Sequence, residues 1–193
     1  MAWALTPWGY EVDGELAPLL TSEDFAAMTD GAYLADARVE SAIDAFTSAI
    51  RRYCGWHVAG VMPCRATLDG GGHSLWLPSN HVHTVTRVTV CGVEVTAYEW
   101  NRQGLLRVPH SPDMLRCVEV EYQAGHDGTP PDLAEFVVRR VEQALAKSRG
   151  VMQETAGSVS ISYAQSFATD LGGGQFGRSD VPALLSYRLV EAM

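Results

Sequence analysis

The chain has 193 residues, of which 47% are hydrophobic and 19% are charged, and this composition predicts one folded domain or one domain with a modest insert. Its formal net charge is -9 at pH 7, and the basic residues form no cluster. The composition excludes a disordered chain, and the charge argues against a protein that holds nucleic acid by neutralising phosphates.

Targeting and membrane signals are missing from the sequence. Residues 1–15 have neither a basic region nor an unbroken apolar run, and no later segment has the length and apolar character of a membrane span. We therefore expect a soluble protein that is made in a cytoplasm. In that reducing compartment the four cysteines, Cys54, Cys64, Cys91 and Cys117, are expected to remain unpaired.

Two helices are predicted in the first third of the chain. The first spans Thr21 to Asp30, with Thr21 as its cap and Asp24 at the capping-box position. The second starts near Asp36 and ends before Gly55. Its apolar stripe consists of Val39, Ile43, Phe46, Ile50 and Tyr53, and its polar face carries Glu40, Asp44, Arg51 and Arg52.

A two-residue period replaces the helical one between about Val58 and Tyr122. Short runs with strand character are separated by turns, and we expect an antiparallel unit of roughly five to six strands. These runs are 65–68, 74–77, 81–90, 93–96, a reversal over 100–105, and 117–122, the last of which alternates cleanly.

The helical period returns after Gly128. Thr129 is the expected cap, two prolines fit the first turn, and the buried stripe contains Leu133, Phe136, Val137, Val141, Ala144 and Leu145. Residues 153–180 are polar and rich in glycine, which predicts a long mobile arm with one strand-like run at 159–163. A final amphipathic helix is expected from Val181 to Met193.

Several residue groups could carry chemistry. A zinc site could be built from Cys54, His57 and Cys64, but the second closely spaced pair of ligands that such sites normally have is missing. We therefore favour the simpler interpretation, in which these residues pack around the end of a helix. His81 with His83, and Glu119 with Glu121, each share one face of a strand, where solvent exposure explains them better than metal binding or acid–base work.

Two catalytic fingerprints were also tested against their context. Residues 172–177 satisfy the G-x-G-x-x-G pattern, but no strand precedes them to form a dinucleotide site. No G-x-S-x-G motif occurs, so a serine hydrolase has little support. The sequence thus predicts a chain that is not an enzyme, without catalytic residues, bound metal or cofactor.

The order of the parts resembles that of head-tail connector (adaptor) proteins of tailed double-stranded DNA bacteriophages. The similarity covers about residues 20–150. It includes the TSEDF helix, VESAIDAFTSAIRRYCGW, the turn-rich LDGGGHSLWLP, VEVEYQAGHDG and PPDLAEFVVRRVEQA. The larger β insert and C-terminal arm of this chain depart from the pattern.

The resemblance implies an α+β fold, with a small helical bundle of three to four helices, an inserted antiparallel β unit and an extended C-terminal arm that ends in a helix. The expected parts are an N-terminal segment and helical core (1–57), the β insert (58–125), more helical core (126–150), and the arm with its terminal helix (151–193).

The resemblance also implies a virion protein at the head-tail interface, assembled in the host cytoplasm. Its expected partners are the portal protein, a stopper or tail-completion protein, and further copies of itself in a dodecameric ring. Genomic DNA would pass through without specific binding, and no membrane is involved. Glu40 and Asp44 are the candidates for facing the channel, because an acidic wall repels phosphates.

The arm is the candidate for docking. Its terminal helix carries an apolar stripe of Val181, Leu184, Leu185 and Leu189, which suits binding to the portal or a neighbouring subunit, and a chain that ends at Gly150 is expected to keep its fold. Two alternatives remain. One is a head-closure (stopper) or tail-terminator protein, and the other is a small zinc-binding protein or enzyme that uses Cys54, His57 and Cys64.

Overall fold

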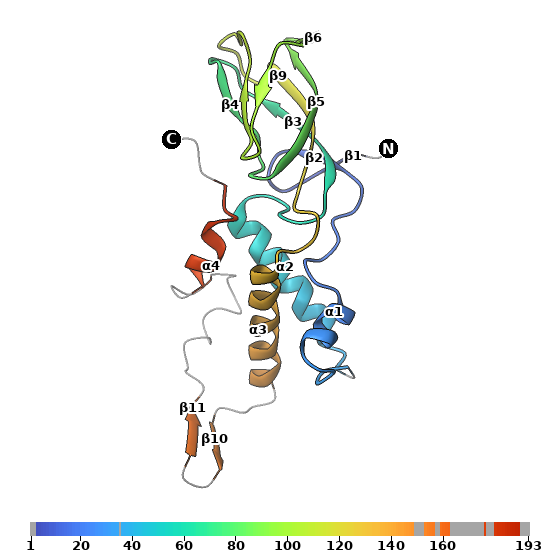
Figure 1. Cartoon of the computed structure of the whole chain (residues 1–193), viewed down its shortest axis with the longest axis vertical. Helices are drawn as coiled ribbons and strands as arrows, with labels where there is room; N and C mark the ends of the chain where they lie inside the picture. Colours follow the sequence, from blue (N-terminus) through green and yellow to red (C-terminus); the bar gives the residue numbers. More distant parts are fainter. Residues whose placement is uncertain are drawn as a thin grey trace. The chain divides into compact units, whose positions relative to one another are not determined.

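The computed structural model describes residues 3–34, 36–148, 153–156, 159–162, 176 and 180–189. The fold is α+β, as predicted, with four helices and antiparallel sheets in the described residues (Figure 1). The chain divides into two compact units. We call them the β unit (residues 1–17, 51–130 and 187–193) and the helical unit (residues 18–50 and 131–186). Within the described ranges, none of the helices is long and apolar enough to serve as a membrane span.

The β unit is built on a six-stranded antiparallel sheet. In spatial order its strands are β1 (Trp3–Leu5), β2 (Glu11–Asp13), β3 (Met62–Leu68), β9 (Val118–Ala124), β5 (Val82–Val90) and β6 (Val93–Glu94). Strand β9 pairs with β3 on one side and with β5 on the other along its whole length. The centre of the sheet is therefore formed by strands that are far apart in the sequence.

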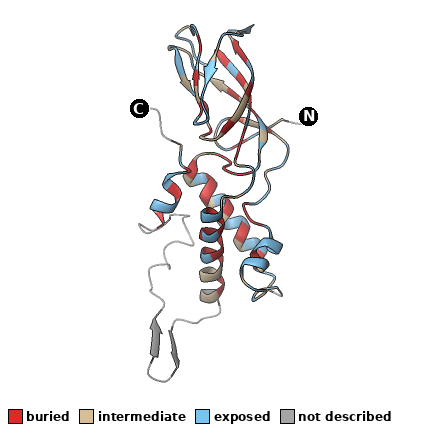
Figure 2. Ribbon diagram, viewed as in Figure 1, coloured by how far each residue is buried: buried red, intermediate tan, exposed pale blue. Residues whose placement is uncertain are grey.

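Strand β9 shows why these residues form the core. Its side chains alternate between buried and accessible positions, and the buried ones are Val118, Val120, Tyr122 and Ala124. One face of the strand packs on the interior while the other meets solvent, which confirms the predicted two-residue period. Figure 2 shows the buried residues gathered along the strands of this unit.

A smaller three-stranded sheet completes the β unit, with the order β4 (Ser74–Trp76), β8 (Leu105–Arg107) and β7 (Glu99–Trp100). The predicted reversal over residues 100–105 is the β7–β8 hairpin. Gly104 in this hairpin has a φ of 90°, and a Cβ there would collide with the carbonyl oxygen of Ser79. Only glycine fits this position without strain.

The helical unit contains α1 (Ser22–Met28), most of α2 (Val39–Cys54), α3 (Pro131–Ser148) and α4 (Val181–Leu185). The capping box of α1 is confirmed, because Thr21 Oγ1 accepts from the Asp24 amide at 3.0 Å and the Asp24 carboxylate accepts from the Thr21 amide at 3.4 Å. Phe25, Val39, Ile43, Leu133, Val137 and Val141 are among its buried apolar residues.

The structure differs from the prediction in three places. No strand was predicted among the first residues, yet β1 and β2 extend the large sheet. Helix α2 begins at Val39 and not near Asp36, because Asp36 Oδ1 accepts from the Arg38 amide in a turn before the helix. The terminal helix ends at Leu185 and does not reach Met193, which itself lies outside the described residues.

The predicted mobile arm lies mostly outside the described residues. Within it, β10 (Gln153–Ala156) and β11 (Val159–Ser162) pair as an antiparallel hairpin. The strand-like run at 159–163 is thus confirmed for residues 159–162, whereas β10 was not predicted.

Candidate assembly and binding surfaces

The C-terminal end of α2 leads into a buried polar site of the β unit. Gly55 follows the helix with a φ of 80°, a left-handed conformation that glycine adopts easily, and it ends the helix. Trp56 and His57 come next and are completely buried. The interpretation of this stretch as a helix end is confirmed.

Both ring nitrogens of His57 lie in hydrogen bonds. Nε2 is 3.0 Å from the carbonyl oxygen of Ala124, and Nδ1 is 2.8 Å from the hydroxyl of Tyr10. Because a carbonyl oxygen can only accept, the neutral ring carries its proton on Nε2, and Nδ1 accepts from the Tyr10 hydroxyl. The Tyr10 oxygen accepts in turn from the His57 amide at 3.0 Å. All polar atoms of this imidazole are therefore satisfied.

Burial sets the protonation state of His57. Loss of hydration lowers its pKa below the usual value; the hydrogen bond to Ala124 opposes this shift, and the positive charge of Arg51 adds to it. The ring is consequently neutral near pH 7. A neutral, fully bonded imidazole without solvent contact supports packing and has no access to a substrate.

The burial of Arg51 shows that one prediction was wrong. The sequence placed it on the polar face of the helix, but its side chain is buried. Its guanidinium donates from Nε to the His57 carbonyl at 2.9 Å and from Nη2 to the Ala17 carbonyl at 2.6 Å. Arg51 thus joins the backbone just after the helix end to the segment that precedes α1, a role that helical periodicity alone could not reveal.

Cys54, His57 and Cys64 do not form a metal site. Among the described residues, no group of three His, Cys, Asp or Glu side chains is placed to hold a metal ion. Burial raises the pKa of both Cys54 and Cys64 to about 12, so both are protonated thiols in the folded chain near pH 7. The geometry contradicts the zinc alternative.

The paired side chains on the strands are engaged elsewhere. The rings of His81 and His83 do lie together, with centroids 5.2 Å apart, but His83 Nε2 is 2.7 Å from the carbonyl oxygen of Gly125, and the His81 ring lies tilted against that of His126, with centroids 4.1 Å apart. Glu121 forms an ion pair with Arg65 at 3.0 Å, and Glu119 is exposed. The G-x-G-x-x-G run at 172–177 lies outside the described residues except for Phe176, whose ring is 5.8 Å from that of Phe136.

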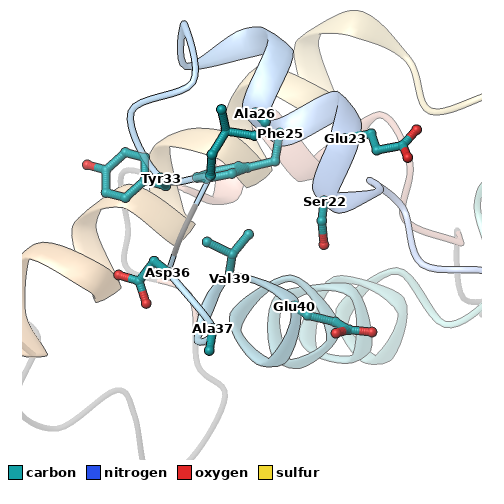
Figure 3. Close-up of a pocket in the computed structure, with 10 residues that line it drawn as sticks. Ser22, Glu23, Phe25, Ala26, Tyr33, Asp36, Ala37, Val39 and Glu40 are labelled. Carbon is teal, nitrogen blue, oxygen red and sulfur yellow. The ribbon is translucent and has the colours of Figure 1, made fainter.

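A pocket of about 350 Å³ opens in the helical unit between α1, the following loop and the start of α2. Figure 3 shows Phe25, Tyr33 and Val39 around this hollow together with the acidic side chains of Glu23 and Glu40. Sequence reasoning did not identify this pocket. The walls of the pocket come from three segments that meet only on folding, so the sequence offered a single local signal, the break between the two helices at Gly31.

Glu40 and Asp44, the candidates for facing a channel, are both exposed on α2. They are four residues apart and therefore lie on one face of the helix, one turn from each other. Glu40 also lines the pocket described above. The structure thus gives these two carboxylates the solvent access that a role in a channel would require, and that role stays a prediction.

The C-terminal candidates do not share one exposed stripe. Leu184 is completely buried, Val181 and Leu189 are half-buried, and Leu185 is 55% exposed. Helix α4 packs on α3 within the helical unit. There the buried carboxylate of Asp180 pairs with Arg140 at 3.1 Å. Of the four predicted docking residues, only Leu185 offers most of an apolar side chain to a partner.

Residues 187–189 belong to the β unit and pack beside the helix end. The Tyr187 carbonyl accepts from Trp56 Nε1 at 2.6 Å, and the Leu189 amide donates to the Cys54 carbonyl at 2.9 Å. These bonds explain why the terminal helix stops early, because the backbone that would continue it is bonded elsewhere. The end of the described chain is therefore already part of the folded protein.

Comparison with known proteins identifies neighbours by structure alone. No family model matches the sequence, and no curated protein matches it. A chain from the "Neck of empty GTA particle computed with C6 symmetry" aligns with a TM-score of 0.57 and 17% identity, covering 95% of this chain and 97% of that chain. A chain from the "Neck of native GTA particle computed with C12 symmetry" has a TM-score of 0.52 and 18% identity, covering 93% and 98%. The fold of this protein is thus that of neck chains over almost their whole length.

Proposed function

We propose that this protein is a structural virion protein, a head-tail connector (adaptor) that forms a homo-oligomeric ring under the portal and continues the DNA channel toward the tail. The observation that carries the proposal is the fold, which matches chains from two particle necks from end to end. The C12 and C6 symmetries of those assemblies support a ring of identical subunits. The order of the predicted helices and strands along this sequence, which resembles that of connector proteins, supports the same role.

The charge of the chain suits a DNA conduit. A net charge of -9 repels the phosphate backbone, so that duplex DNA can slide through a ring without being held. Glu40 and Asp44 are exposed on one helix face, and repetition around a ring would turn two carboxylates into an acidic band. We assign the channel wall to this face of α2.

Charge reversal tests this assignment. Assembled rings that carry Glu40→Lys and Asp44→Lys should retain duplex DNA at low salt, and the retention should decrease steeply as salt rises. The matched control carries Glu119→Lys and Glu135→Lys, which change the net charge equally at exposed sites on β9 and α3. If both double variants retain DNA to the same extent, the α2 face does not line the channel.

Docking to the portal is assigned to residues 151–193, with Leu185 as the exposed apolar contact. An apolar side chain that is buried in an interface loses binding when it is replaced by a charge. Leu185→Asp should abolish association with portal rings while leaving the unfolding curve unchanged. Ala183→Asp is the control, because Ala183 is an exposed residue of the same helix.

Electron microscopy of the full chain mixed with its cognate portal rings tests the proposed function as a whole. We expect an additional ring of density on the portal, with matching symmetry. Binding to tail-tube ends would identify a tail terminator, and binding only to portals that already carry another protein would identify a stopper. Either of these results would overturn the adaptor assignment.

A further inference from the structure

Two cysteines that play no part in the helix-end site meet at one end of the large sheet. The paired register of β5 and β9 ends at Val90 opposite Val118. Cys91 follows Val90 as the first residue of the turn between β5 and β6, and Cys117 directly precedes β9. The Cys91 amide donates to the Cys117 carbonyl at 2.6 Å, so the backbones remain paired at this position. Cys91 and Cys117 therefore lie beside each other at the end of the sheet, just outside the paired parts of β5 and β9.

The backbone spacing at such a pair suits a disulfide. Hydrogen-bonded antiparallel partners have Cα atoms about 5.5 Å apart, and disulfides span Cα separations of roughly 4.4 to 6.8 Å. Cys91 has a φ of 50° and Gly92 a φ of 78°, as in the tight two-residue turn that joins β5 to β6.

The two thiols also have complementary access. Cys91 is exposed, whereas Cys117 is buried, with its Sγ 3.6 Å from the carbonyl oxygen of Pro112. A Cβ added at Gly70 would collide with that Sγ, so the sulfur is confined on this side by backbone. The pKa of Cys91 is raised by loss of hydration and by the Cys117 thiol, with which it shares a hydrogen bond. The two side chains are thus close enough to influence each other.

We propose that Cys91 and Cys117 form an oxidation site, a dithiol that a low-molecular-weight disulfide converts into an intramolecular disulfide joining the β5–β6 turn to the start of β9. The inference concerns the β unit alone and does not depend on the proposed function. It departs from the expectation that all four cysteines remain thiols, because that expectation rested on the compartment and not on the geometry.

The reaction consists of two thiol–disulfide exchanges. The exposed Cys91 thiolate attacks one sulfur of the oxidant, forms a mixed disulfide and releases one small thiol. The Cys117 thiolate then attacks the Cys91 sulfur, which closes the protein disulfide and releases the second small thiol. Two protein thiols are oxidised, one small disulfide is reduced, and the two protons from the protein thiols end on the released thiols.

Oxidised glutathione is the probe for the test. The reduced full chain is incubated with it, quenched in acid, alkylated after denaturation and mapped by peptide mass spectrometry. We expect a cross-linked peptide pair that contains Cys91 and Cys117, while Cys54 and Cys64, which are fully buried, are recovered alkylated. The midpoint of thermal unfolding should rise by roughly 5 °C or more, because the bond restrains the unfolded chain between residues 91 and 117.

Two serine variants separate this site from simple surface oxidation. Cys117→Ser should trap glutathione on Cys91, and Cys91→Ser should leave Cys117 unmodified, with no rise in the midpoint for either variant. A wild-type chain that keeps glutathione on Cys91 beside a free Cys117 would overturn the proposal. Dimers linked through Cys91 would overturn it as well.

Discussion

Replacing His57 by alanine should destabilise the β unit strongly. The imidazole is completely buried, and its removal leaves the Tyr10 hydroxyl without its acceptor and the Ala124 carbonyl without its donor. A buried polar group that loses its partner costs about 1 to 3 kcal/mol, so two such groups cost roughly 2 to 6 kcal/mol before any cavity is counted. The variant should therefore lose a large part of the stability of a typical domain.

Trp56→Ala provides the scale for this effect. Truncation of a buried tryptophan costs roughly 3 to 5 kcal/mol, and Trp56 also donates a hydrogen bond to the Tyr187 carbonyl. Helical and strand patterns in the sequence predict packing for Trp56 and suggest a much smaller role for His57. The structure revises that difference, because it gives the imidazole two buried hydrogen-bond partners from distant parts of the chain.

Urea unfolding monitored by far-ultraviolet circular dichroism measures both variants without relying on tryptophan fluorescence. His110→Ala is the control, because His110 is exposed and its removal should change the free energy of unfolding by no more than about 0.5 kcal/mol. A loss below about 1 kcal/mol for His57→Ala would refute the reasoning. It would mean that water replaces the imidazole and satisfies both partners.

The remaining predictions concern the helical unit, the terminus and pH. Asp180→Ala should lower the free energy of unfolding by about 3 kcal/mol, since it removes the carboxylate that pairs with the buried guanidinium of Arg140, and urea unfolding checks this. Gly125→Ala should destabilise by roughly 2 to 4 kcal/mol in the same assay, because a Cβ at a φ of 119° would meet a neighbouring carbonyl and the His57 ring. A chain that ends at Gly150 should melt at a lower temperature than the full chain by circular dichroism, since it lacks α4 and its buried leucine. Because the folded state lowers the pKa of His57, the unfolded chain binds protons more readily, and stability should fall as the pH drops below about 6.5. His57→Gln should flatten that slope in unfolding curves recorded across the range.

Local patterns predicted the elements whose signals are contained in a few neighbouring residues. The capping box at Thr21 and Asp24 needs only one turn of chain, and the alternation along β9 needs only one strand. Gly55 after an amphipathic helix likewise predicted where α2 ends. In each case the same residues carry both the signal and the structure.

Features that depend on contacts between distant parts of the chain could not be predicted from local patterns. Strand β2 has three residues and is stabilised by β3, which lies far along the sequence, so no local period could reveal it. Arg51 occupies a polar position by helical period, but its hydrogen-bond acceptors come from Ala17 and His57. Similarly, the cross-strand meeting of Cys91 and Cys117 follows from the register of β5 with β9 and not from their spacing.

The stretch IRRYCGWH shows why residue types alone point toward chemistry that geometry then excludes. Around this buried helix end, the side chains of Arg51, Trp56 and His57 donate to backbone carbonyls of segments that pack against it, and the Cys54 carbonyl of the helix accepts from the Leu189 amide. The small, buried Cys54 occupies the last helical position, where a larger side chain would have to displace its neighbours. Residue types that could form a reactive centre in an open cleft are therefore buried and hydrogen-bonded around the end of α2 in this protein. Because both ring nitrogens of His57 and the indole nitrogen of Trp56 are bonded within the chain, this stretch supports packing, and the exposed face of α2 and Leu185 stay the proposed contact surfaces.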